Sequence, residues 1–216
     1  MKKHFYLLSA CVAVCMISQA QINPGAILIG GSVSFNDEST NQANGLATKS
    51  TAFSINPYFG KAIRQNLIVG FDLLYDHSHS GNNVPDLTGN DYGLGVFVRK
   101  YKYLGNRFYL FGQTRLGGTY GKTSSKSADN LGNIDEADTK SYSVSLGFMP
   151  GISYAISRKW QVEATLPNLA YIEYTHGKTT NSPSSAGTDY TQHAFTAGSI
   201  LNNYPLTLGI SFLLNR

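Results

Sequence analysis

The residues with the clearest potential for chemistry are the histidines, and the densest group of them lies at His77-Ser78-His79-Ser80. His77 and His79 would point to the same side of an extended strand, so they could hold one metal ion, with Asp76 nearby. Zinc sites in proteins use three or four protein ligands, and here only two histidines share a face. We therefore interpret the pair as solvent-exposed loop residues, and the sequence predicts no metal site and no cofactor.

A serine hydrolase would need a serine, a histidine and an acidic or amide side chain that meet at one point. His176 and His193 lie in or beside Thr175–Gln192, a segment rich in Ser and Thr, but abundance does not establish a catalytic pair. Lipases embedded in the outer membrane carry a His-x-Ser order, and neither His77 nor His79 has it. We expect the chain not to be an enzyme, and a membrane-embedded lipid hydrolase is the alternative.

The elements that must position these residues are seen best in Ser141–Ser157. Its even-numbered residues from 142 to 156 are large or apolar, and its odd-numbered residues are mostly small or polar. A strict period of two predicts a β-strand with one apolar face. Tyr142 and Tyr154 bracket that face, and at about 3.4 Å per residue with a tilt of about 45° they differ in height by roughly 29 Å. This height is close to that of the apolar band of a transmembrane barrel.

Seven further segments show the same alternation. The eight expected strands are about Gly25–Asn36, Thr51–Gly60, Leu67–Asp76, Asp91–Lys100, Arg107–Tyr120, Ser141–Ser157, Trp160–Tyr174 and a last strand through Leu206–Leu214. Short turns alternate with long polar connections, at about Asp37–Ser50, His77–Asn90, Gly121–Lys140 and Thr175–Gln192. Short turns at one rim and long loops at the other are typical of outer-membrane barrels. The sequence therefore predicts an all-β fold, namely an eight-stranded antiparallel up-and-down transmembrane β-barrel.

Prolines complicate three of these strands, because a proline cannot donate a hydrogen bond to a sheet ladder. We expect Pro167 to interrupt the seventh strand. We expect Pro150 to cause a bulge or a locally broken ladder in the sixth strand. Pro205 marks the start of the last strand or a bulge, and the preceding Phe195–Leu201 is either an upper extension of that strand or part of the loop.

The apolar face of each strand is assigned to lipid for three reasons. Aromatic residues gather near strand ends, the opposite face is small and polar, and the connections differ strongly in length. A soluble secreted barrel with its apolar face inward is the alternative. The predicted aromatic girdle consists of Tyr75, Tyr92, Tyr142, Tyr154 and Trp160.

Four charged residues fall on the strand faces opposite to the lipid: Asp72, Arg99, Arg115 and Glu163. A basic side chain on the lipid face would cost about 2–4 kcal/mol at the midplane. We predict instead a lumen charge cluster whose members pair and fill a barrel too narrow for an open channel. A narrow pore is the alternative.

Residues 1–20 have the features of a secretory signal peptide. Two lysines follow Met1, Leu7–Ile17 is an apolar core, and a small-residue cleavage site ends at Ala20. We expect cleavage near Ala20-Gln21 and a barrel domain over residues 21–216. A lipoprotein signal cut at Cys11 is the alternative.

Removal of that segment changes the charge of the chain. The 17 basic residues lose two lysines, so 15 remain against 13 acidic residues, and the excess falls to +2. Both cysteines, Cys11 and Cys15, are lost as well. The mixed charges of Gly121–Lys140 are interpreted as a solvated loop. We therefore expect no binding of nucleic acid.

Three segments carry a resemblance to a known family: Ile55–Tyr75, INPYFGKAIRQNLIVGFDLLY; Leu94–Gln113, LGVFVRKYKYLGNRFYLFGQ; and Pro150–Tyr171, PGISYAISRKWQVEATLPNLAY. The chain resembles the small eight-stranded outer-membrane β-barrel domain family of diderm bacteria, related in architecture to OmpX- and OmpA-type barrels. In that family such segments form the hairpins of strands 2–3, 4–5 and 6–7. One departure is the end of the chain, Phe212-Leu-Leu-Asn-Arg216, because such barrels usually end on an aromatic residue.

The resemblance implies a location in the cell outer membrane, with outer-membrane lipids and the barrel assembly machinery as partners. It specifies no activity. We expect a non-enzymatic structural or surface-interaction role, in which the long outer loops could bind a surface ligand.

Overall fold

The structure is a computed structural model, and it describes residues 22–41, 47–81, 86–128, 134–181, 189–199 and 206–214. The expected signal peptide and its cleavage site, together with Pro205, lie outside these residues. The ten strands are β1 (Ile27–Asn41), β2 (Ala47–Arg64), β3 (Leu67–Gly81), β4 (Asp86–Gly105), β5 (Phe108–Ala128), β6 (Ile134–Ala155), β7 (Trp160–Thr165), β8 (Ala170–Asn181), β9 (Tyr190–Gly198) and β10 (Thr207–Leu214). No helix in the described part of the chain is long and apolar enough to cross a membrane.

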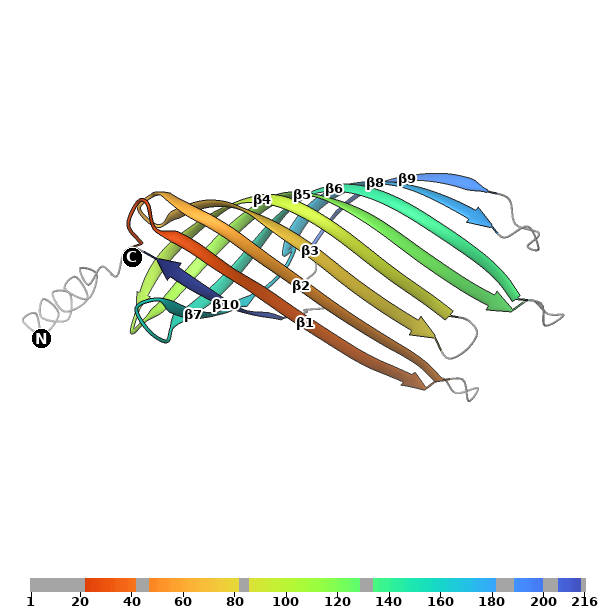
Figure 1. Cartoon of the computed structure of the whole chain (residues 1–216), viewed down its shortest axis with the longest axis horizontal. Helices are drawn as coiled ribbons and strands as arrows, with labels where there is room; N and C mark the ends of the chain where they lie inside the picture. Colours follow the sequence, from red (N-terminus) through yellow and green to blue (C-terminus); the bar gives the residue numbers. More distant parts are fainter. Residues whose placement is uncertain are drawn as a thin grey trace, which may run out of the picture.

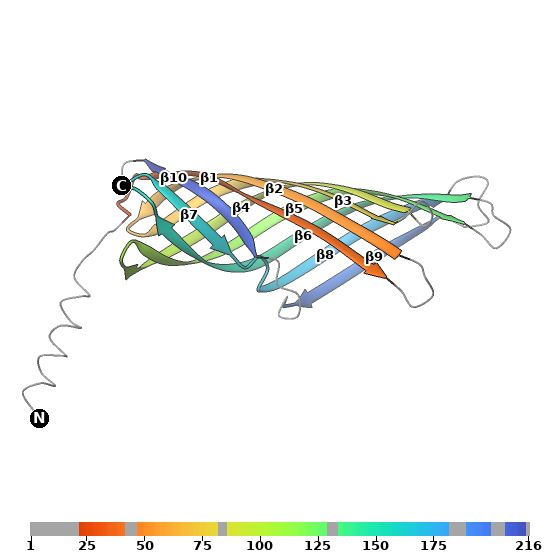
Figure 2. The same ribbon diagram turned by 90° about the horizontal axis from the view of Figure 1, so that it is seen from below.

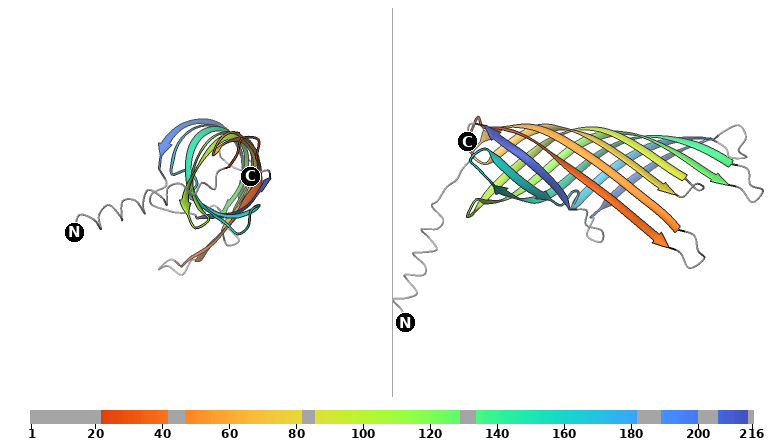
Figure 3. Two further views of the ribbon diagram at one scale, coloured as in Figure 1. Left: turned by 90° about the vertical axis from the view of Figure 1, so that its left-hand side faces the viewer. Right: turned by 60° about the horizontal axis from the view of Figure 1, so that its bottom comes forward.

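Eight of the strands close into a ring, whose wall is drawn in Figure 1 and whose end-on view is in Figure 3. Strands β1 to β6 pair antiparallel in chain order, β7 pairs with the lower end of β6, and β10 lies between β7 and β1. The closing contact pairs Ile27 with Leu214, so β1 begins and β10 ends at the same rim. The short turns lie at this rim too, and Asn106 and Arg107 between β4 and β5 have φ of 48° and 71°. Two positive φ values are the geometry of the tight turns that match strand twist. The predicted eight-stranded antiparallel barrel is confirmed.

The expected seventh strand consists of two halves, β7 and β8. Both lie beside β6: β7 pairs with the residues from Gly151 to Ala155, and β8 pairs with those from Ala137 to Phe148. The break at residues 166–169 contains Pro167, as predicted. The last strand has the same two-part structure, because β9 pairs with β8 while β10 pairs with β7. Phe195 lies in β9, which ends at Gly198, so the described beginning of the segment Phe195–Leu201 belongs to the upper extension, while Ile200 and Leu201 lie outside the described residues.

Pro150 produces a broken ladder on one side only. On the β5 side the register runs through Pro150, opposite Gly112, without a shift. On the other side, Phe148 pairs with β8 and Gly151 pairs with β7, but the two residues between them have no register partner. The carbonyl oxygen of Pro150 accepts a hydrogen bond from Leu166 N instead (2.9 Å). The break of the ladder therefore coincides with the break that contains Pro167.

The expected long loops are largely paired strands, which corrects the prediction for those segments. The β5–β6 register continues from Gly121 and Ser141 to Ala128 and Ile134, and the β3–β4 register continues to Gly81 and Asp86. Their side chains lose the apolar alternation because both faces meet polar surroundings there. Backbone pairing needs no apolar face, so the hairpins extend (Figure 1).

One part of the wall has no partner strand on one side. β1 pairs with β10 only from Ile27 to Val33, and in the described ranges no strand pairs with its Ser34–Asn41 part on the side away from β2.

Large apolar side chains cover the outer face of the ring, and a smaller aromatic core fills its lower interior. Ile29, Val33, Phe71, Leu94 and Val144 are among the exposed residues of the outer face. The buried core consists of Ile22, Ala26, Leu28, Tyr58, Ala62, Ile68, Phe97, Tyr101, Tyr109, Phe111, Ala155 and Leu213. Ile22 seals the lower rim: its N–H donates to Asn66 Oδ1 (2.9 Å), and its carbonyl accepts from Asn66 N (3.0 Å).

Candidate functional site

The interior of the ring contains a buried ion pair between Arg99 on β4 and Glu163 on β7. Arg99 Nη1 lies 2.8 Å from Glu163 Oε2, and both residues are buried. Arg99 Nε donates a further hydrogen bond to Gln113 Oε1 (2.7 Å). Buried charges persist when they are paired and their remaining hydrogen-bonding atoms are used. The guanidinium is paired, and its Nε and Nη1 atoms both donate hydrogen bonds.

The carboxylate of Glu163 is also held by hydroxyl groups. Tyr58 donates to Oε2 (2.9 Å), and Ser211 donates to Oε1 (2.7 Å). The Tyr101 hydroxyl lies 3.3 Å from Oε1 and accepts from Arg99 Nη1 (3.0 Å). Residues of β2, β4 and β10 therefore all contact the carboxylate of Glu163 on β7. These contacts link strands on both sides of the β1–β10 pairing that closes the ring.

Aromatic rings enclose the Arg99 guanidinium. Its central carbon lies 4.5 Å from the ring centroid of Phe111 and 4.7 Å from that of Tyr58. Phe97 and Tyr101 complete the enclosure at 5.6 and 5.9 Å. Cation–π contacts of this kind strengthen when water is excluded. The lower lumen is thus filled by a charged network with an aromatic wall.

A second ion pair lies above the first one. Arg115 on β5 contacts Asp72 on β3, with Nη2 2.7 Å from Oδ1 and Nε 2.9 Å from Oδ2. Gly95 and Gly117 give the guanidinium its space, because a Cβ on either glycine would collide with it. These glycines of β4 and β5 therefore serve packing of this arginine, in addition to any effect on curvature.

The four predicted lumen charges all lie inside the ring, and they form two separate pairs rather than one cluster. Near them is a cavity of about 150 Å³, lined by Ser32, Asn56, Gln113, Met149, Thr165 and Thr207 among others. This volume is smaller than the roughly 300–1,000 Å³ of typical ligand pockets. The arrangement can hold charges in place and block the lumen.

The predicted girdle residues lie on the outer face in two groups. Tyr75, Tyr92 and Tyr142 belong to one cross-strand row, which Tyr120 completes: Tyr75 pairs with Tyr92, Tyr92 with Tyr120, and Tyr120 with Tyr142. Neighbouring rings pack at 5.2 Å (Tyr75 and Tyr92) and 5.0 Å (Tyr120 and Tyr142). We call these four residues the tyrosine row. Tyr120 was missed in the sequence, although its place at the end of the expected fifth strand could have revealed it.

The other two girdle residues lie near the short-turn rim. Tyr154 packs on Phe108 with ring centroids 4.8 Å apart, and Trp160 packs on Phe212 at 4.9 Å. All four side chains are exposed or partly exposed on the outer face.

The four histidines within the described ranges lie on strands instead of in loops. On β3, His77 Nδ1 lies 2.9 Å from Asn90 Oδ1, and His79 Nδ1 lies 3.2 Å from Thr88 Oγ1. The interpretation of this pair as loop residues is therefore wrong. His176 and His193 are register partners on β8 and β9, with their Nδ1 atoms 3.3 Å apart. Within the described ranges, no group of three or more His, Cys, Asp or Glu residues could hold a metal ion.

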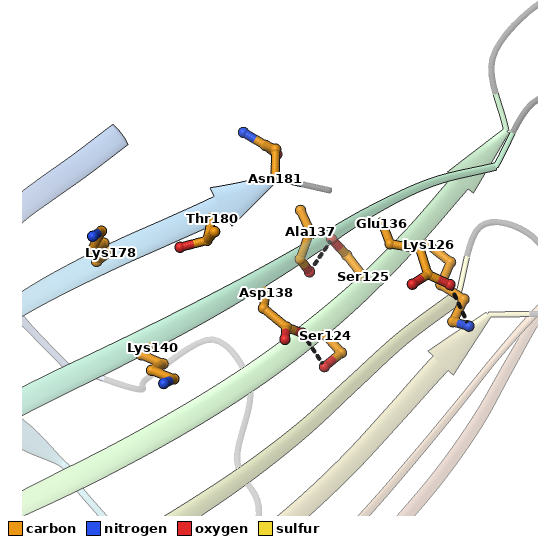
Figure 4. A pocket seen from close by; sticks show the side chains of 10 residues that line it. All are labelled: Ser124, Ser125, Lys126, Glu136, Ala137, Asp138, Lys140, Lys178, Thr180 and Asn181. Atoms are coloured by element: carbon orange, nitrogen blue, oxygen red, sulfur yellow. Dashed lines mark hydrogen bonds and ion pairs between the residues drawn. The ribbon is translucent and has the colours of Figure 1, made fainter. Parts of the chain in front are cut away.

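Beyond the tyrosine row, the outer face of β5, β6 and β8 carries charged side chains around a pocket of about 520 Å³. Figure 4 shows its lining, which comprises Ser124, Ser125, Lys126, Glu136, Ala137, Asp138, Lys140, Lys178, Thr180 and Asn181. We call it the rim groove. From the sequence, most of these residues were interpreted as a solvated loop, because no local pattern shows that the segment is a paired hairpin with one charged face.

Ion pairs connect some charges of the rim groove. Lys126 Nζ lies 2.7 Å from Glu136 Oε1, and Lys122 Nζ lies 3.5 Å from Asp138 Oδ2. The pKa of the Asp138 carboxyl lies below its ordinary value, first because Ser124 donates a hydrogen bond to it (2.6 Å) and then because Lys122 is near. The hydrogen bond and charge of Glu136 raise the pKa of Lys126.

Three solved structures have similar folds. Neisserial surface protein A is 14% identical, with a TM-score of 0.44 over 90% of this chain and 99% of its own. A major outer membrane protein from Thermus thermophilus is 9% identical, with a TM-score of 0.49 over 91% of this chain and 100% of its own. The outer membrane protein OprG from Pseudomonas aeruginosa is 12% identical, with a TM-score of 0.48 over 90% of this chain and 97% of its own. No curated protein matches the chain in sequence.

A comparison with families of sequences is more decisive. The outer membrane protein beta-barrel domain matches residues 7–199, which is most of the chain. The chain belongs to the outer membrane protein beta-barrel domain family and is an outer-membrane β-barrel protein.

Proposed function

We propose that the protein is a non-enzymatic outer-membrane barrel with a closed lumen, which acts at the cell surface through its long β-hairpins. The observation that carries this proposal is the buried ion pair of Arg99 and Glu163 inside the ring. Any open path along the barrel axis would have to break this pair and separate the aromatic side chains around it. Breaking a buried ion pair costs about 3–5 kcal/mol, which opposes spontaneous opening.

The hairpins support the surface role. β5 and β6 continue for eight register pairs beyond Tyr120 and Tyr142, and β3 and β4 continue for six beyond Tyr75 and Tyr92. Tyrosine rows mark the membrane interface in barrels of this class, so these segments project beyond the lipid. Rigid scaffolds that carry exposed variable segments are well suited to recognition.

Orientation is tested by labelling cysteines on intact cells. Residues 1–20 contain both cysteines of the chain, so a mature chain without them has no background thiol. Ser124→Cys, on the outer part of β5, should react with a membrane-impermeant maleimide on intact cells. Ile156→Cys, in a short turn, should react only after the outer membrane is permeabilised. The reverse pattern would place the hairpins in the periplasm and refute the proposal.

The closed lumen and the absence of catalysis are tested separately. In planar bilayers the purified barrel should give no steady single-channel current, and a steady current would establish a pore instead. Expression should leave the acyl chains of the outer-membrane lipids unchanged by mass spectrometry. A lipid product that disappears when His176 and His193 are replaced would establish a hydrolase.

A further inference from the structure

The rim groove is bordered by a row of three lysines on neighbouring strands. Lys122 on β5 pairs with Lys140 on β6, and Lys140 pairs with Lys178 on β8. Each lies two residues beyond an aromatic residue: Lys122 beyond Tyr120, Lys140 beyond Tyr142, and Lys178 beyond His176, the register partner of Tyr142. Residues two apart on a strand share a face, so the lysines lie on the outer face directly above the tyrosine row.

Two of these lysines form no ion pair within the described part of the chain. Lys122 is paired with Asp138, and Lys126 is paired with Glu136, which uses both carboxylates of the groove. Lys140 and Lys178 have no such pairing there, and both are exposed. The lining of the groove therefore carries three lysines against two carboxylates, and Lys122 at one edge is balanced by Asp189 at the other, where its Oδ1 accepts a hydrogen bond from Asn181 N (3.1 Å), so one positive charge is in excess.

Like charges directly opposite each other on adjacent strands are destabilising. Lys140 and Lys178 occupy such positions, so an anion between them would relieve the repulsion. Hydroxyl and amide groups of Ser124, Thr180 and Asn181 line the same groove, and they add polar groups around it (Figure 4). A phosphate group has the matching chemistry, because it carries a charge of about −1.5 to −2 and three strong acceptor oxygens.

The depth of the groove indicates which phosphate would reach it. The pair of Lys122 and Lys140 lies two residue pairs above Tyr120 and Tyr142, where the headgroups of the outer leaflet meet the aromatic residues of a barrel. The groove volume of about 520 Å³ lies within the range of small-molecule sites. We propose that Lys140 and Lys178, with Thr180, bind the phosphate of a phosphorylated lipid headgroup in the outer leaflet. This inference rests on the outward orientation of the hairpins proposed above.

The test compares lipid retention by the folded barrel in detergent, measured by native mass spectrometry. The probes are bis-phosphorylated lipid A, its dephosphorylated form, and inorganic phosphate. Wild type should retain the phosphorylated lipid about tenfold more tightly than the dephosphorylated one. The reason is that each basic residue at a membrane surface strengthens the binding of an anionic lipid. The variant Lys140→Gln/Lys178→Gln should lose that preference.

The matched control is Lys100→Gln/Lys102→Gln, which removes two exposed lysines of β4 near the short-turn rim. It should keep the preference, and heat-modifiable migration on gels should show that both double variants are folded. Equal retention of both lipids, or a preference that survives Lys140→Gln/Lys178→Gln, would refute the lysine site. Inorganic phosphate that binds as tightly as the lipid would refute the lipid as its source. Cysteine labelling at Ser124 reports the orientation independently, so failure of this inference is distinguishable from failure of the proposed function.

Discussion

Arg99 and Glu163 show, at the level of single residues, how the alternation of side chains along a strand places charged groups inside the ring, where they form an ion pair. Their inward direction could be predicted from the period of two, because a charge on the lipid face is costly. Their pairing could not be predicted, since the two residues are 64 positions apart and meet only when β10 closes the ring. The same limit explains why the sequence suggested one cluster of four charges and the structure contains two pairs.

Glu163→Leu should destabilise the barrel strongly. The change leaves the Arg99 guanidinium buried without its counter-charge, and such a loss costs about 3–5 kcal/mol. The double variant Arg99→Met/Glu163→Leu removes both charges and should recover most of that stability. Urea unfolding in lipid vesicles measures both. Equal stability of the single and the double variant would show that the ion pair is not what holds this part of the lumen.

Gly95→Ala should loosen the second pair. The added Cβ would lie 2.7 Å from Nε and Cζ of Arg115, whose guanidinium is held by Asp72 and cannot move freely. Overpacking of this kind costs about 1–3 kcal/mol. Gly118→Ala is the control on the neighbouring strand, because its nearest contact is Ser143 O at 3.7 Å, an ordinary distance. Urea unfolding should separate the two variants, and an equal effect would contradict the role assigned to Gly95.

At the scale of elements, the strands within the apolar band could be predicted, while their outer parts could not. Alternation identifies a strand only where one face meets lipid or core. Beyond Tyr120 and Tyr142, one face carries mostly Lys, Asp and Glu and the other mostly Ser and Thr, so neither face is apolar and the segment had the composition of a loop. The pairing there follows from the register already set below it, which no local pattern records. The break at Pro167 could be predicted, because a proline cannot donate a hydrogen bond to the ladder in any register.

Shortening the β5–β6 hairpin should leave the barrel folded. Deleting residues 123–128 and 134–139 removes six paired positions from each strand and keeps Lys122 opposite Lys140. The inward and outward faces below the cut are unchanged, so heat-modifiable migration on gels should persist. Deleting Phe111 alone is the contrasting variant, because a shift of one residue turns every side chain on one side of the cut to the opposite face. A shortened hairpin that fails to fold would show that the outer segment takes part in barrel formation.

At the scale of the whole molecule, the wall is uneven. Strands β2 to β6 are long, whereas the side of the ring made by β7 and β10 is low, with β8 and β9 continuing only part of it (Figures 2 and 3). The number of strands, their antiparallel order and the lipid-facing side followed from the sequence. The unequal heights did not, because they depend on where two half-strands end against β6.

The eight residue pairs of the β5–β6 hairpin beyond Tyr120 and Tyr142 also determine what can reach the protein from outside. At about 3.4 Å per residue and a tilt of about 45°, they rise roughly 20 Å above the tyrosine row. With the outward orientation proposed above, a carbohydrate coat thinner than this leaves the upper part of the hairpin within reach of antibodies or phage, while Lys122 and Lys140 at its base stay covered. Immune recognition would then act on the upper residues of the hairpin and spare the lysines below, so the two parts of one ribbon would evolve under different pressures.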